Sequence, residues 1–272
     1  MNSKVAILSF LLFTSSAVCA QPGLYPIGAA AVGMGNITTL SNDVWTAFTN
    51  PAGLGIAPAF AVGVQHEQRY SLPDFGVDAF AAVFPVWDGG VGLTVANLGF
   101  SEQGESRFGI QIGRKLGAKI AAGVGFHAHL LRYPSEYSNA FALSADAGIY
   151  ANLFPRLTTG VYVSNVSFAR FNNEARDRLP IIFHWGVGYE TTSTIMLYAE
   201  LEKDVNAPLR AKIGSSCYLF DVLYLRLGVL SQPFEIHYGL GYAFRIFQMD
   251  FALYRHPVLG FSPQLSLSIA LK

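Results

Sequence analysis

Apolar and polar residues alternate with a period of two along most of the chain. In residues 120–130, apolar residues are separated by alanine, glycine and two histidines, and residues 234–244 repeat the pattern with aromatic members. Successive side chains of a β-strand point to opposite faces. The pattern therefore predicts strands with one apolar face and one polar or small face.

We predict fourteen such strands, which start near Ala59, Phe75, Gly90, Ser106, Lys119, Ser138, Thr158, Pro180, Thr194, Leu209, Leu223, Phe234, Phe247 and Ser262. Their connections alternate between tight turns and longer segments; the longer ones are residues 132–137, 169–179 and 255–263. An even number of antiparallel strands, with short turns at one rim and longer loops at the other, is typical of bacterial transmembrane β-barrels.

The composition agrees with a membrane barrel. Hydrophobic residues make up 51% of the chain, charged residues 13%, and the formal net charge is zero. Beyond the first segment, no uncharged run reaches the roughly 20 apolar residues that a membrane helix needs. Lysine and arginine are dispersed, which argues against a nucleic-acid partner.

Residues 1–20 have the features of a secretory signal peptide. Lys4 precedes the mostly apolar residues 5–13, and small residues lead to Val18, Cys19 and Ala20. We expect cleavage after Ala20 and export to the outer membrane of a Gram-negative (diderm) bacterium. Lipid modification of Cys19 is the weaker alternative, because the three residues before it are a poor lead-in.

Residues 21–57 lack the two-residue alternation. This segment holds the hatch motifs, which are Gly33, Met34, Gly35, Asn50, Pro51, Ala52 and Gly53. We predict a short N-terminal hatch over residues 21–57, which plugs an all-β, 14-stranded antiparallel transmembrane barrel formed by residues 58–272.

The two ends of the chain resemble a known family. The hatch motifs, with Asp43-Val44-Trp45 and Leu54, resemble the amino terminus of the FadL-like outer-membrane superfamily, especially its PorV/PorQ branch. Residues 239–242, 247–252, 256–260 and 264–268 look like the last three strands of that branch. The resemblance implies a fourteen-stranded barrel with an amino-terminal hatch.

The resemblance also implies two kinds of function. PorV-like members serve type IX secretion by engaging exported proteins or partner subunits, whereas FadL-like members pass hydrophobic small molecules through a plugged barrel with a lateral opening. We predict a PorV/PorQ-like, partner-binding component of a secretion machinery, because the loops are short and the lumen is charged. The alternative is passive transport of a hydrophobic ligand, with Phe80 and Phe84 as apolar lining.

Charged residues of the later strands fall on the polar face. They are Glu200, Glu202, Arg210, Lys212, Arg226, Glu235, His237 and Asp250. Charges on the lipid face are costly, so these side chains should face the lumen. Opposite charges on neighbouring strands can pair, and we expect a lumen polar network that either anchors the hatch or is simply solvated.

No motif indicates enzymatic chemistry, so we predict no catalytic residue, no cofactor and no metal. His127 and His129 share one strand face, but a zinc site needs three or four protein ligands. The sequence contains no nucleophile, base and orienting group in recognisable spacing. The glycines of the hatch lack the pattern of a phosphate-binding loop.

Two features remain as candidates for function. Asn97 falls on the apolar face of its strand, close to Gly99; this indicates either a lateral kink, as the FadL resemblance implies, or an ordinary strand end. The connection 169–179 is the predicted partner loop, with Arg170, Asn172, Glu174, Arg176, Asp177 and Arg178. The expected partners are outer-membrane lipid, a protein subunit and a hydrophobic ligand.

Overall fold

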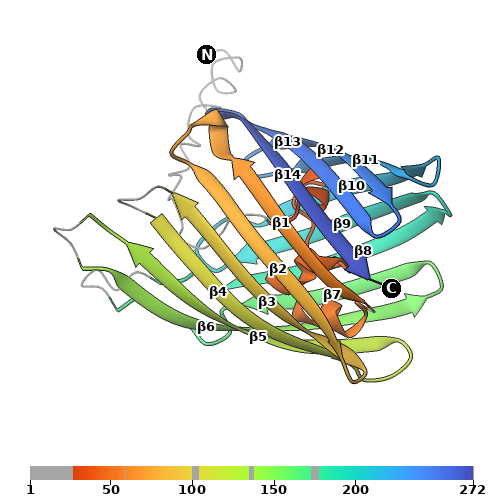
Figure 1. Cartoon of the computed structure of the whole chain (residues 1–272), viewed down its shortest axis with the longest axis horizontal. Coiled ribbons are helices and arrows are strands. Elements are labelled where there is room, and N and C mark those ends of the chain that lie inside the picture. The colour runs from red at the N-terminus through yellow and green to blue at the C-terminus, as the bar shows by residue number, and fades with distance from the viewer. Residues whose placement is uncertain (1–26, 58, 100–103, 135–137, 173–177, 272) are drawn as a thin grey trace, which may run out of the picture.

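The computed structural model describes residues 27–57, 59–99, 104–134, 138–172 and 178–271, which form a closed antiparallel barrel of fourteen strands around a short buried segment (Figure 1). Each strand pairs with its neighbours in sequence, and β1 closes the barrel against β14. The strands are β1 (Phe60–Gln68), β2 (Gly76–Val86), β3 (Gly89–Gly99), β4 (Gly104–Lys115), β5 (Ile120–Arg132), β6 (Ala140–Phe154), β7 (Leu157–Ser164), β8 (Ile182–Thr192), β9 (Ile195–Asp204), β10 (Arg210–Leu219), β11 (Leu223–Leu230), β12 (Glu235–Phe244), β13 (Phe247–His256) and β14 (Gly260–Leu271).

The strand prediction is confirmed in number and position. Every predicted start lies within two residues of the observed one. The predicted long connection at residues 255–263 is wrong, because β13 and β14 continue to His256 and from Gly260, which leaves only residues 257–259 between them. Tight pairing of His256 with Gly260 explains the shorter connection.

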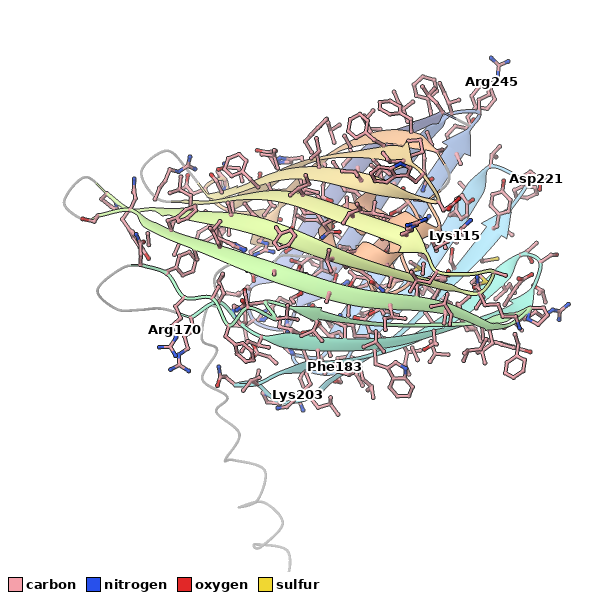
Figure 2. All side chains as sticks on the ribbon, turned by 90° about the horizontal axis from the view of Figure 1, so that it is seen from below. Lys115, Arg170, Phe183, Lys203, Asp221 and Arg245 are labelled. Carbon is pink, nitrogen blue, oxygen red and sulfur yellow. The ribbon has the colours of Figure 1, made fainter. Side chains whose placement is uncertain are left out.

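The two faces of the sheet differ as the alternation predicts. Large apolar side chains point outward and stay exposed, Phe183 among them (Figure 2). Phe80 and Phe84 also face outward, which corrects their expected place in the lumen; the inward positions of β2 belong to Val77, Ala79, Ala81 and Val83, which are buried. An apolar exterior of this kind is what a transmembrane barrel requires.

The two rims of the barrel are unlike each other. At the turn rim, strands β2 to β13 are joined in pairs by residues 87–88, 116–119, 155–156, 193–194, 220–222 and 245–246. The loop rim carries the remaining connections, of which residues 165–181 are the longest. Aromatic side chains are highly exposed at the turns, with Trp87 at 83% and Phe220 at 87%; aromatic girdles at the membrane interface have this character.

Residues 27–57 form the segment inside the barrel, which we call the hatch (Figure 1). It contains the helix α2 (Ala29–Gly33) and the 3₁₀ helices η1 (Val44–Phe48) and η2 (Pro51–Gly55), and a third such helix, η3 (Arg69–Ser71), lies at the loop rim. Asp43 and Asn50 cap η1 and η2 by accepting hydrogen bonds from Trp45 N and Ala52 N, as short polar side chains do at helix starts. The predicted signal peptide lies outside the described residues.

The largest apolar cluster joins the hatch to the wall. Trp45, Phe48 and Leu54 of the hatch pack against β1, β2 and β3. Among the described residues, none of the helices has the length and apolar character needed to cross a bilayer. The core of this molecule is therefore the interior of the barrel, which the hatch fills.

Candidate functional site

The hatch touches the barrel wall at a ring of inward-facing glycines. A Cβ atom added at Gly113 would lie 2.2 Å from the carbonyl oxygen of Pro51, and one added at Gly228 would lie 2.2 Å from the carbonyl carbon of Met34. The other members of the ring, where an added Cβ would lie within 3.0 Å of a hatch atom, are Gly63, Gly92, Gly123, Gly148, Gly160, Gly186, Gly188, Gly214 and Gly239. Glycine allows two backbones to approach this closely. The hatch is therefore packed against most strands of the barrel.

Two small cavities lie on either side of one hatch segment, residues 34–40. The cavity toward the loop rim has a volume of about 140 Å³, and Asn36 and Thr38 are part of its lining. The cavity toward the turn rim has a volume of about 180 Å³, and Met34, Ile37 and Leu40 are part of its lining. We call residues 34–40 the septum, because its residues line both cavities.

Glu200 on β9 and Lys212 on β10 hold the septum to the wall. Glu200 Oε2 accepts hydrogen bonds from Thr38 N at 2.9 Å, Thr39 N at 2.9 Å and Thr39 Oγ1 at 2.7 Å. Lys212 Nζ donates to the carbonyl oxygen of Asn36 at 2.6 Å and to Glu200 Oε1 at 2.7 Å. We call Glu200 and Lys212 the latch.

The latch is part of a buried charge cluster. Glu200 and Lys212 are only 1% and 3% exposed. Glu202 Oε2 lies 2.8 Å from Lys212 Nζ, and Arg210 Nη1 donates to Glu202 Oε1 at 3.0 Å. Burial of an unpaired charge is very costly, so removal of one partner from such a pair typically costs ~3–5 kcal/mol. These charges therefore favour the attached position of the septum.

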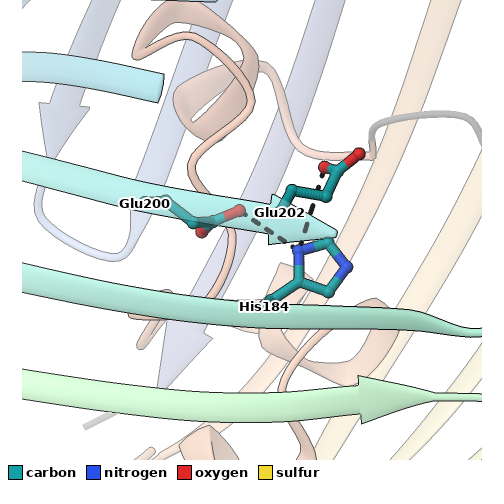
Figure 3. Close-up of side chains that lie close together, drawn as sticks. All are labelled: His184, Glu200 and Glu202. Atoms are coloured by element: carbon teal, nitrogen blue, oxygen red, sulfur yellow. Dashed lines mark hydrogen bonds and ion pairs between the residues drawn. The ribbon is translucent and has the colours of Figure 1, made fainter. Parts of the chain in front are cut away.

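A lysine already pairs with both carboxylates of this cluster. His184, Glu200 and Glu202 present ligand atoms that all lie within 4.8 Å of one another (Figure 3). The Lys212 ammonium group, however, lies 2.7 Å from a Glu200 oxygen and 2.8 Å from a Glu202 oxygen. It neutralises the carboxylates from the position that a cation would take. His184 contacts the same Glu200 oxygen at 3.3 Å and belongs to the latch surroundings.

The structure divides the predicted lumen network into three groups. The latch group holds the charges of β9 and β10. Arg226 and Asp250 form a second group, with Arg226 Nη1 and Asp250 Oδ1 2.6 Å apart. In the third group, His237 Nε2 lies 3.2 Å from Glu235 Oε2.

The hatch side of the latch was not among the residues predicted from the sequence. Thr38 and Thr39 lie in a segment without periodicity, and the chain distance to Glu200 exceeds 160 residues. His184 was also missed, although the alternation of β8 places it on the inward face. Strand pairing brings it next to Glu202.

His127 and His129 have carboxylate and hydroxyl neighbours on the adjoining strands. His127 Nε2 lies 2.9 Å from Asp146 Oδ2, and Arg107 Nη2 lies 3.7 Å from the same oxygen. His129 Nε2 lies 3.0 Å from Ser144 Oγ. The pair therefore belongs to a buried polar group on β4, β5 and β6, toward the loop rim.

The remaining candidates lie near the loop rim. At Asn97, β3 pairs with β4 without a register shift, and Asn97 Oδ1 accepts hydrogen bonds from Ser106 Oγ at 2.9 Å and Arg132 Nη2 at 2.8 Å. Gly99, the last residue of β3, has a φ of 98°. The wall is continuous at this position, and the polar side chain is satisfied by its neighbours.

The predicted partner loop is described only in part. Arg170 and Arg178 oppose each other in an isolated bridge at the loop rim (Figure 2). Asn172 Oδ1 accepts a hydrogen bond from Phe141 N at 2.7 Å, which joins the loop to the start of β6. Glu174, Arg176 and Asp177 lie outside the described residues.

The fold is similar to that of solved membrane channels. No protein-family model matches the chain, and no curated protein matches it. The Pseudomonas putida toluene transporter TodX aligns at 14% identity over 90% of this chain and 98% of its own, with a TM-score of 0.65. The CymD monoaromatic hydrocarbon channel aligns at 13% identity over 92% and 98%, with a TM-score of 0.62, and a Pseudomonas aeruginosa FadL homologue at 10% over 91% and 98%, with a TM-score of 0.59. At these identities the likeness shows the fold alone.

Proposed function

We propose that the protein is a plugged outer-membrane channel through which small hydrophobic molecules cross passively. The observation that carries the proposal is the shared fold over nine-tenths of the chain with the TodX and CymD channels, which are described as a toluene transporter and a monoaromatic hydrocarbon channel. The closed barrel with an apolar exterior supports placement in a membrane. The proposed site is the outer membrane of a diderm bacterium.

The geometry of the hatch supports a gated route rather than an open pore. At the wall glycines the hatch lies in direct contact with the barrel wall, so a solute cannot pass straight through the lumen at this height. The septum lies between a cavity on the loop side and a cavity on the turn side, because its residues are part of the lining of both. In the proposed mechanism, displacement of the septum joins the two cavities, and the latch returns it to the wall.

The secretion role predicted from the PorV/PorQ resemblance has no support among the similar structures reported above, two of which are described as a toluene transporter and a monoaromatic hydrocarbon channel. A protein partner at the loop rim therefore stays a prediction. The function proposed here is the one that was the alternative in the sequence analysis.

The proposal is tested by uptake measurements. Radiolabelled toluene uptake is compared between diderm bacterial cells that carry the folded protein in their outer membrane and otherwise identical cells without it, with labelled arabinose as a polar control. Cells are used because the lipopolysaccharide leaflet slows hydrophobic solutes that cross a phospholipid bilayer unaided. We expect faster toluene entry and unchanged arabinose entry. Equal toluene entry in the two preparations, with the barrel shown to be folded by its heat-dependent mobility in gels, would remove the proposal.

A further inference from the structure

The cavity on the turn side of the septum has a two-sided lining. Its hatch side has the apolar side chains of Ala30, Ala31, Met34, Ile37 and Leu40, followed by the polar residues Ser41, Asn42 and Asp43. Its wall side combines two tyrosine rings with polar groups, which are Tyr198, Tyr224, Ser216, Arg226 and Gln248. The volume is about 180 Å³. A protein cavity of about 150 Å³ holds benzene, so this one has room for a single substituted ring.

Most of the charged groups at this cavity are already paired with each other. Arg226 Nη1 donates to Asp250 Oδ1 at 2.6 Å, and Gln248 Nε2 donates to Asp250 Oδ2 at 2.8 Å. The Arg226 guanidinium also lies 4.8 Å from the centre of the Tyr224 ring. A positively charged ligand is therefore disfavoured here, because Arg226 already occupies the face of the Tyr224 ring.

Asp43 retains capacity to accept hydrogen bonds. Its Oδ1 accepts one from Trp45 N at 3.0 Å, and an ionised carboxylate can accept several more. Within the described part of the chain, the side-chain hydroxyls of Tyr198, Ser216 and Tyr224 make no hydrogen bond. An unsubstituted hydrocarbon in the cavity would cover these half-buried groups without offering them a hydrogen-bond partner, which disfavours its binding.

We propose that this cavity, whose carboxylate is Asp43, binds a neutral single-ring aromatic molecule that bears a hydroxyl group, such as a phenol. The ring packs between the tyrosines and the apolar hatch residues, and the hydroxyl group donates to the Asp43 carboxylate. Asp43 and Asp250 together outnumber Arg226 by one charge, so an aromatic carboxylate is disfavoured. The inference rests on the proposed function for the cavity's place on a route, but binding is measured without transport.

The ionisation of Asp43 gives the site a pH dependence. Burial, followed by the nearby Asp250 carboxylate, raises the pKa of Asp43 to about 6, while Arg226 and the hydrogen bond from Trp45 lower it. The other titratable groups that line the cavity are the phenols of Tyr198 and Tyr224. Protonation of Asp43 removes its charge, so binding of a hydroxyl donor weakens as the pH falls from 8 to 5.

The experiment uses two ligands of nearly equal shape, p-cresol and p-xylene, and the purified full-length protein in detergent. Binding is measured by calorimetry against matched micelles without protein. We expect p-cresol to bind at least ~5-fold more tightly than p-xylene, because only the hydroxyl satisfies the carboxylate. Tighter binding of p-xylene, of benzylammonium or of benzoate would overturn the inference.

A conservative variant identifies the residue. Asp43→Asn keeps a side chain that caps a helix start, and it should weaken p-cresol binding ~5- to 10-fold and abolish its dependence on pH. Asp88→Asn, in an exposed turn, is the matched control and should bind as the native protein does. Unchanged p-cresol binding in Asp43→Asn would refute the site. Toluene uptake without preferential p-cresol binding would refute only this inference, whereas preferential binding without uptake would refute only the proposed function.

Discussion

The contacts of the latch predict how much more often the channel opens when the charge of Glu200 is removed. Substitution of Glu200 by glutamine keeps the size of the side chain but removes its charge. In the native protein one carboxylate oxygen faces three donors of Thr38 and Thr39, and the other faces the Lys212 ammonium. A glutamine amide has one acceptor and one donor group. Whichever way it turns, its NH₂ group meets donors.

The magnitude follows from this geometry. Removal of one charge from a buried pair costs ~3–5 kcal/mol, and part of that loss falls on the attached position of the septum, because the septum supplies three of the hydrogen bonds to Glu200. A shift of ~3 kcal/mol corresponds to a ~100-fold increase in the population with a displaced septum. The native protein should therefore show rare openings, and Glu200→Gln should show them ~100-fold more often.

The assay is single-channel recording in planar lipid bilayers, in which displacement of the septum appears as ion conductance. Glu202→Gln is the matched control, since Glu202 lies on the same strand and contacts Lys212 at 2.8 Å, while its charged contacts are with wall residues. It should raise the frequency of openings less than ~10-fold. If Glu200→Gln conducts no more than the native protein, or if Glu202→Gln matches it, the septum is not held by Glu200.

Two further outcomes are expected. Gly228→Ala places a methyl group 2.2 Å from the backbone of the hatch and should lower the free energy of unfolding in urea by ~1–3 kcal/mol. The control is Gly117→Ala, which has open space around it and should change the free energy of unfolding by less than ~0.5 kcal/mol. Equal effects of the two substitutions would contradict the packing of the hatch against Gly228. Asn50→Ala removes a helix cap and the hydrogen bond from Asn50 Nδ2 to the carbonyl oxygen of Thr39. Protease cleavage within the hatch should therefore become faster. An unchanged cleavage rate would show that Asn50 does not hold the hatch in place.

The local pattern of the chain explains why the barrel could be predicted so closely. Alternation with a period of two decides which face of each strand is apolar, and β-strands that must bury backbone groups in lipid can only close into a barrel. Residues 120–130 illustrate this, since their histidines are buried and Phe126 is exposed. The alternation also excludes a register shift by one residue, which would put charges such as Glu200 into lipid, whereas a shift by two residues keeps both faces and only the structure excludes it.

The candidate site needed contacts that sequence spacing does not encode. The sequence shows Gly228 only as a small inward-facing residue. The structure shows that the backbone of Met34 lies directly against it. The charges of β9 to β13 were predicted to form one network, whereas the strand register places Arg226 opposite Ser216, four residues along β10 from Lys212, so Arg226 and Asp250 form a group apart from the latch. The hatch has no periodicity, so its path inside the barrel could not be read in advance.

The sequence by itself determined the strands and their inward and outward faces, because these depend on interactions between residues that are close along the chain or on the cost of charge in lipid. Only the tertiary structure decided that Thr38 and Thr39 meet Glu200, that Lys212 pairs with both Glu200 and Glu202, and that Asp43 shares a cavity with Tyr198. These contacts join residues far apart in the chain. They form because closure of the barrel brings all its strands around one short segment, whose polar backbone groups must find partners on the wall.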